Sequence, residues 1–229
     1  LSSAILERQM NLKSLVCAFA GGILALGTAA ASADVVYTFD ATDVAAFGSA
    51  PYGTVTLVQN GADIDVTVSL RSDLDFVLTG GPHSVFSFNA ANTSIGDIKN
   101  IVFASGPSGP ANVIVLAPGA NTPFGTFSFM IDCVDNKACG GQGGSNPIVD
   151  PLTFTVMNAV YSDFGVENDA GASFAADVIC RSGRCNGATG AVGVTGPGEE
   201  TGNLVVPEPA TAALLGLGLL SVAAARRRR

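Results

Sequence analysis

The chain has 229 residues, of which 48% are hydrophobic and only 13% are charged, and its formal net charge is −8. This length suffices for one domain with a substantial hydrophobic core. With 11 Lys and Arg against 19 Asp and Glu, the chain lacks the positive field that binding to nucleic acid or to an anionic membrane surface requires, so the composition excludes both classes of partner for its folded part.

The N-terminal 33 residues have the pattern of a secretory signal peptide. Met10-Asn11-Leu12-Lys13 begins a basic segment, an apolar run follows over residues 15–30, and Ala31-Ser32-Ala33 is a small-x-small cleavage site. We expect residues 10–33 to direct export through the Sec machinery, with Ala31 and Ala33 read by signal peptidase. Residues 1–9 are polar and irregular, and we interpret them as an upstream extension that is not native.

Residues 34–206 form the mature region once both ends are set aside. This region holds 17 acidic and five basic residues, a net charge of −12. It is rich in Val, Phe, Thr, Ala and Gly and poor in Lys and Glu, which is typical of a β protein with glycine-rich turns.

Period-two alternation predicts an all-β domain over residues 34–185. In Asp63–Leu70 every second residue is apolar, and Asn60-Gly61 before it is a strong hairpin signal that joins it to a strand over Gly53–Val58. Turn residues recur every ten to fifteen positions, so we expect an antiparallel β-sandwich or jelly roll. The other expected strands are Val35–Phe39, Phe76–Thr79, Ser84–Asn89, Ile98–Ala104, Asn112–Leu116, Thr126–Ile131, Leu152–Ala159 and Phe174–Val178.

Two parts of the mature region carry weaker signals. Tyr161–Phe164 and Ala170–Ala176 are compatible with a short helical turn as well as with extended chain. Residues 186–206, rich in Gly, Thr, Val and Glu, are predicted to be a flexible linker.

Four cysteines remain after removal of the signal peptide, which contains Cys17. An even number in an exported domain predicts two disulfides among Cys133, Cys139, Cys180 and Cys185, with three pairings possible. The spacings C-x5-C and C-x4-C do not fit common zinc sites, so we assign no metal.

No catalytic constellation emerges, and we assign no catalytic residue and no cofactor. His83, the single histidine, follows Gly80-Gly81-Pro82 in a turn that we expect to be solvated. A hydrolase would need two carboxylates across a cleft, and a calcium site would need several oxygen ligands; for calcium we considered Asp132 with Asp135 and Asn136. The acidic pairs are Asp63 with Asp65, Asp73 with Asp75, Asp132 with Asp135, and Asp163 with Glu167.

Sugar binding remains an alternative that the aromatic content does not favour. Sugar sites usually offer exposed aromatic rings, whereas this chain has no Trp and only three Tyr: Tyr37, Tyr52 and Tyr161. Most of its 13 Phe fall on alternating strand positions, where we expect them in the core.

The last 23 residues, 207–229, have three parts in a fixed order. Pro207-Glu208-Pro209 keeps the chain extended, an almost uncharged run follows over residues 210–225, and Arg226, Arg227, Arg228 and Arg229 end the chain. As a helix the apolar run would be roughly 24 Å long, shorter than the roughly 30 Å hydrocarbon core. The arginines would hold its end on the cytoplasmic side.

These three parts resemble the PEP-CTERM sorting signal, which marks a family of exported bacterial proteins. The resemblance implies that an exosortase, a membrane-embedded enzyme, recognises the chain at or near Pro207-Glu208-Pro209. It also implies a Gram-negative host that makes extracellular polysaccharide.

Together these features predict an exported, exosortase-sorted protein of the cell surface or extracellular matrix. The expected path runs through an inner-membrane intermediate held by residues 210–225. We expect a non-catalytic structural or adhesive role linked to exopolysaccharide. A carbohydrate- or calcium-binding module and, less favoured, a secreted hydrolase are the alternatives.

Overall fold

The computed structural model describes residues 33–105, 113–134 and 147–200, and this part of the chain forms an antiparallel β-sandwich. The fold class predicted from the sequence is therefore confirmed. The predicted signal peptide and the apolar C-terminal run lie outside the described residues. Within the described residues, no helix is both long enough and apolar enough to span a membrane.

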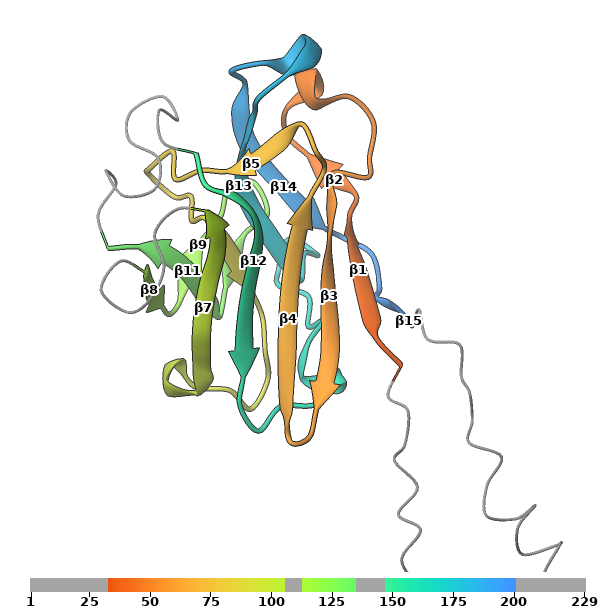
Figure 1. Cartoon of the computed structure of the whole chain (residues 1–229), viewed down its shortest axis with the longest axis vertical. Coiled ribbons are helices and arrows are strands. Elements are labelled where there is room, and N and C mark those ends of the chain that lie inside the picture. The colour runs from red at the N-terminus through yellow and green to blue at the C-terminus, as the bar shows by residue number, and fades with distance from the viewer. Residues whose placement is uncertain (1–32, 106–112, 135–146, 201–229) are drawn as a thin grey trace, which may run out of the picture. The chain divides into compact units, whose positions relative to one another are not determined.

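The first sheet has the order β15-β1-β3-β4-β12-β7 and faces the viewer in Figure 1. All of its pairs are antiparallel, and Val35 of β1 lies opposite Glu200 of β15. Both ends of the described domain therefore meet at one edge of this sheet. Its strands are β1 (Val35–Phe39), β3 (Gly53–Asn60), β4 (Asp63–Leu70), β7 (Ile98–Ser105), β12 (Val149–Val156) and β15 (Glu199–Glu200).

The second sheet has the order β2-β14-β13-β6-β11-β8, and β5 pairs with the far end of β13. Its strands are β2 (Ala41–Thr42), β5 (Leu74–Phe76), β6 (Phe86–Phe88), β8 (Val113–Leu116), β11 (Phe129–Cys133), β13 (Phe174–Cys180) and β14 (Thr189–Val194). A small hairpin of β9 (Gly119–Ala120) and β10 (Thr126–Phe127) and four 3-10 turns complete the described elements. The turns are η1 (Ala45–Phe47), η2 (Ile95–Asp97), η4 (Tyr161–Asp163) and η5 (Gly183–Cys185).

The core lies between the two sheets and is dominated by phenylalanine. Every phenylalanine in the described part of the chain is buried, and several rings pack in pairs, such as Phe88 with Phe154 at 5.2 Å between centroids. On β4 the alternation Ile64, Val66, Val68 and Leu70 is buried as predicted. The inward face of each strand thus supplies one continuous apolar layer.

A second, smaller apolar cluster lies on the opposite face of the second sheet. It contains the buried side chains Phe124, Phe127, Ala172, Ala175 and Ala191. Small residues on β13 and β14 leave room for the two rings, which the segment around the β9–β10 hairpin supplies. This face of the second sheet is therefore covered by loops.

The structure corrects the predicted linker of residues 186–206 over its described part, residues 186–200; the remainder lies outside the described residues. Thr189–Val194 is β14, which pairs along β13 from Phe174 to Ile179, and Glu199–Glu200 is β15. The glycines that suggested a linker are needed here because loop side chains cover this strand. A Cβ on Gly193 would lie 2.4 Å from the Phe124 ring.

Smaller corrections concern strand bounds and the turn regions. The strand predicted at Phe76–Thr79 is β5 (Leu74–Phe76), after which the chain leaves the sheet. Tyr161–Asp163 is a 3-10 turn. In the second candidate segment, Ala170–Ala176, Ala170 lies in a turn and β13 begins at Phe174. The predicted hairpin between residues 58 and 63 is present, with Asn60 opposite Asp63.

Candidate functional site

The carboxylates that looked like candidate catalytic pairs mostly anchor the backbone or neighbouring side chains. Asp63 accepts a hydrogen bond from Asn158 N at 2.9 Å, and Asp65 accepts from Thr155 Oγ1 at 2.8 Å. Asp163 caps its own turn by accepting from Val160 N at 2.9 Å. These carboxylates have a structural use, which competes with the cleft role considered from the sequence.

The pair Asp73 and Asp75 is held by arginines. Arg71 makes a two-point contact with Asp73 at 2.6 and 3.0 Å, which lowers the pKa of that carboxyl, mainly through the hydrogen bond. Arg181 pairs with Asp75, whose pKa burial nevertheless raises. Both ion pairs are partly exposed, so each stabilises the fold only modestly.

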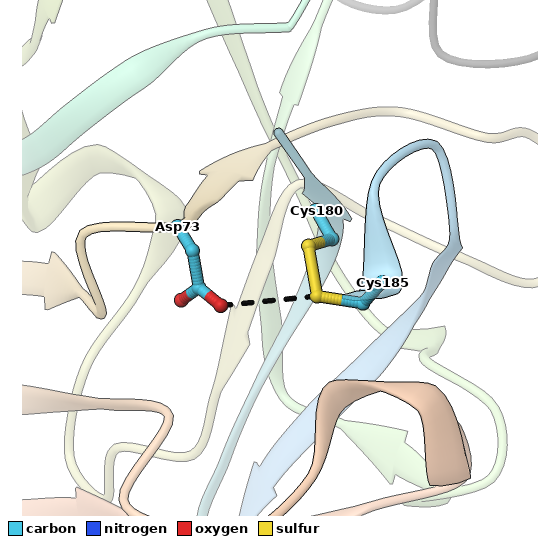
Figure 2. A group of neighbouring side chains, drawn as sticks. All are labelled: Asp73, Cys180 and Cys185. Atoms are coloured by element: carbon cyan, nitrogen blue, oxygen red, sulfur yellow. Dashed lines mark hydrogen bonds between the residues drawn. A yellow bond between two sulfur atoms is a disulfide. The ribbon is translucent and has the colours of Figure 1, made fainter. Parts of the chain in front are cut away.

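Asp73 also lies beside Cys180 and Cys185, and the potential ligand atoms of the three lie within 4.8 Å of one another (Figure 2). The two cysteines form a disulfide with an S–S distance of 2.09 Å, so they present no thiolate to a metal ion. A disulfide sulfur carries no proton, and the 3.8 Å approach of Cys185 Sγ to Asp73 Oδ2 is a packing contact. This group is a structural clip.

The observed disulfide reduces the three pairings left open by the sequence. Cys180 pairs with Cys185, which excludes both pairings that would link the two cysteine-bearing loops. Cys133 is also disulfide-bonded. Cys139 lies outside the described residues.

A buried acidic pair lies under the segment that joins β5 to β6, residues 77–85, which we name the 77–85 loop. Val77 N donates to Asp177 O at 3.0 Å and Asp177 N donates to Val85 O at 3.3 Å, so both ends of the loop bond Asp177. The Asp177 carboxylate accepts from Thr79 N and Thr79 Oγ1 at 2.7 and 2.6 Å. Asp177 therefore fixes the loop to β13.

Asp132 approaches the same loop from β11, on the other side of β6. Its Oδ1 lies 3.5 Å from Val85 N, and its side chain is almost fully buried. Burial raises the pKa of Asp132 to about 6, and the negative charge of Asp177 adds to this effect. Burial likewise raises the pKa of Asp177, against the opposing hydrogen bonds from Thr79 and the charge of His83.

His83 differs from its predicted place in a solvated turn. It is half-buried, and its Nδ1 is buried without a hydrogen-bond partner among the described residues. Asp177 Oδ1 is orphaned in the same way. Sequence spacing could not have paired these residues, because 94 positions separate His83 from Asp177 and only the strand pairing of β13 with β5 and β6 brings them together.

A shallow hollow of about 590 Å³ opens on the domain surface, and nothing in the sequence pointed to it. Its walls come from residues 125–128 and residues 166–170, with Asn89 and Pro118 completing the lining. Its volume falls in the ordinary range for small-ligand sites. The hollow is thus a candidate binding site in the described part of the chain.

Two asparagines hold the walls of this hollow together. The Asn168 amide donates to Phe124 O and Thr126 O at 2.7 and 3.1 Å and accepts from Ala170 N and Ala172 N at 3.0 and 3.1 Å. Four hydrogen bonds use the full capacity of this side chain. Asn89 ties the same walls by donating to Val166 O and accepting from Ser128 N. The hollow is therefore preformed.

The comparisons with known proteins concern the C-terminal tail. Residues 205–229 match the family model for the PEP-CTERM protein-sorting motif. The chain carries a PEP-CTERM sorting motif. The resemblance predicted from Pro207-Glu208-Pro209, the apolar run and the four terminal arginines is confirmed. The PEP-CTERM motif makes this an exported protein of the cell surface that an exosortase sorts. A search of curated proteins and a search of solved structures each gave no significant match.

Proposed function

We propose that this PEP-CTERM protein is a non-catalytic structural or adhesive component of the cell surface or extracellular matrix, associated with exopolysaccharide. The proposal depends on the observation that a surface-sorting motif is joined to a disulfide-bonded sandwich, in which Asp63 and Asp163 accept hydrogen bonds that hold the fold. Such a domain suits a passive role outside the cell, where structural disulfides persist.

The use of the carboxylates supports a non-catalytic role. A glycosidase needs two carboxyl groups that flank the substrate bond and reach its atoms. Here Asp63, Asp65 and Asp163 accept structural hydrogen bonds, and Asp73 is held by Arg71. Asp177 lies fully buried beneath the 77–85 loop, out of reach of a polymer. These five carboxylates thus have another use in this fold.

The test is where the processed protein resides in its host and what releases it. We expect it in the matrix fraction, and we expect digestion of the polysaccharide to release it. A processed protein that stays freely soluble in the medium, with no matrix association, would overturn the proposal.

A second measurement addresses catalysis directly. The purified processed protein should release no reducing ends from the host's own polysaccharide. Release by the wild type that disappears in Asp132→Asn or His83→Ala would establish a hydrolase and reject the non-catalytic role.

A carbohydrate-binding role is the second candidate function, and the preformed hollow favours it. Its volume of about 590 Å³ accommodates one or two sugar residues. Direct binding would also give the proposed matrix association a molecular basis. The chemistry of the hollow decides which sugars fit.

A further inference from the structure

We propose that the hollow between residues 125–128 and residues 166–170 binds amino sugar units of a glycan, through a protonated amine held by Glu167 and Asp169. The proposal rests on the proposed association with exopolysaccharide and adds the class of sugar and the site. It stands on the charge, the partners and the shape of the lining residues.

The two carboxylates of the hollow differ from those elsewhere in the domain. Glu167 and Asp169 are exposed, and within the described residues neither makes a hydrogen bond or an ion pair. No Lys or Arg lines the hollow. Two unpaired negative charges at one site favour a cationic group and disfavour uronate or sulfate groups.

The remaining lining supplies what the rest of a sugar needs. Thr126 and Ser128 present exposed hydroxyl side chains that donate to and accept from sugar hydroxyls. Pro118 and Val166 add apolar surface for the carbon face of the ring. Phe127, only 1% exposed, lies beneath as part of the second apolar cluster rather than as a stacking platform. Recognition therefore relies on polar contacts.

The backbone holds these groups in place before any ligand arrives. Gly125 has a φ of +90°, and a Cβ there would lie 3.0 Å from both Ala170 Cβ and Asn168 Nδ2. The two walls can approach this closely only with glycine at that position. The hydrogen bonds of Asn168 then hold the two walls together. The backbone of its neighbours Glu167 and Asp169, which carry the two carboxylates, is therefore fixed. A preformed site loses less entropy on binding.

The experiment uses the exported, processed protein and four probes of one length: a glucosamine tetramer, an N-acetylglucosamine tetramer, a uronate tetramer and tetralysine. Calorimetric titration should show binding of the glucosamine tetramer, at least tenfold weaker binding of its N-acetylated counterpart, and no binding of the uronate. Raising the salt from 50 to 500 mM should weaken the binding.

The deciding variant is Glu167→Gln with Asp169→Asn, which keeps shape and removes both charges. It should lose at least tenfold in affinity for the glucosamine tetramer. The matched control, Glu199→Gln with Glu200→Gln, makes the same change of net charge on exposed β15 and should bind as the wild type does.

Three results would overturn the site: no binding of the glucosamine tetramer, equal loss in both double variants, or tetralysine binding as tightly as the sugar. Either of the first two results would show that the sugar amine does not pair with Glu167 and Asp169. The third would show that the hollow attracts any polycation. A protein that stays in the matrix while its hollow binds nothing would reject this site and leave the proposed function standing.

Discussion

Buried carboxyl groups are the residues whose environment differs most from water in this domain. Asp132 lies on β11 and Asp177 on β13, the two strands that flank β6, and both lie beneath the 77–85 loop. Burial raises the pKa of both. A carboxyl whose pKa is higher in the folded than in the unfolded state binds its proton more tightly when folded. Its contribution to stability is full below the unfolded pKa and is lost as the pH rises through the folded pKa.

For Asp132 this window runs from about pH 4 to about pH 6. The free energy of unfolding should therefore fall between these values, by about 3 kcal/mol for a shift of this size. Asp132→Asn should remove that part of the pH dependence, so that at pH 7 the variant gains stability relative to the wild type that it does not gain at pH 4. Denaturant unfolding at several pH values measures it.

The comparison with the variant is needed because other groups act with the opposite sign. Arg71 lowers the pKa of Asp73, so this pair contributes stability that is lost on acidification. Glu199→Gln is the control for removal of one negative charge. Parallel pH profiles for the wild type and Asp132→Asn would show that Asp132 does not titrate in this window.

Close packing at Gly193 makes a second prediction for a single residue. An added Cβ would lie 2.4 to 2.7 Å from three atoms of the Phe124 ring. Gly193→Ala should destabilise the domain by about 1–3 kcal/mol, since the buried ring must shift. Gly196→Ala is the matched control, because its Cβ would meet only Asp40 Oδ2 at 3.5 Å. Equal thermal stability of the two variants would contradict the packing described for β14.

At the scale of elements, the Cys180–Cys185 disulfide closes the turn after β13. This turn also holds Arg181, whose backbone N–H donates to Asp73 O at 2.7 Å, and the 3-10 turn η5. Replacing both cysteines by alanine should lower the free energy of unfolding by about 2 kcal/mol, because the closed loop is short. Chemical denaturation of the two oxidised proteins measures it.

The size of the loss also shows whether the Cys180–Cys185 disulfide acts only on its own turn or is needed for the packing of neighbouring strands. A loss near the expected value means that the disulfide only restricts the unfolded chain. Failure of the double variant to fold would mean that the clip is needed to seat β5 against β13. Peptide mapping of the wild type should recover Cys180 joined to Cys185.

The sequence predicted elements well where local pattern and burial agree. β4 has its predicted bounds, Asp63–Leu70, because each inward residue is apolar and Asn60-Gly61 fixes the turn before it. β14 was missed because its pattern of Gly, Ala and Val reflects contact with Phe124, which comes from a distant part of the chain. Local composition could not distinguish this strand from a linker.

The candidate sites also differ in whether the local sequence reveals them. The tail was recognisable because its three parts are contiguous at residues 207–229, and the family model matches them. The hollow was not recognisable, since its walls come from residues 125–128 and residues 166–170, about 40 positions apart. Its position depends on Asn168, which has no signal of its own in the sequence.

At the scale of the whole molecule, the chain combines an acidic β-sandwich domain with a C-terminal motif for sorting to the surface. β1 and β15 pair at one edge, so the domain begins and ends at neighbouring points. In the sequence, only residues 201–204 separate β15 from the matched motif. Processing of the tail therefore need not disturb the described sandwich, whose last strand within the described residues, β15, lies before the motif in the sequence.

Replacement of Pro207 and Glu208 by alanine tests this separation. The variant should keep a normally folded domain but remain as an unprocessed precursor in the membrane fraction, because the triplet at which we expect the exosortase to recognise the chain has lost two of its residues. Thr201→Ala with Asn203→Ala, just outside the matched motif, is the control and should be sorted as the wild type is. Fractionation and intact mass of the native-host protein measure both. Normal trimming and release of the Pro207 and Glu208 variant would mean that the enzyme recognises the apolar run and the arginines alone.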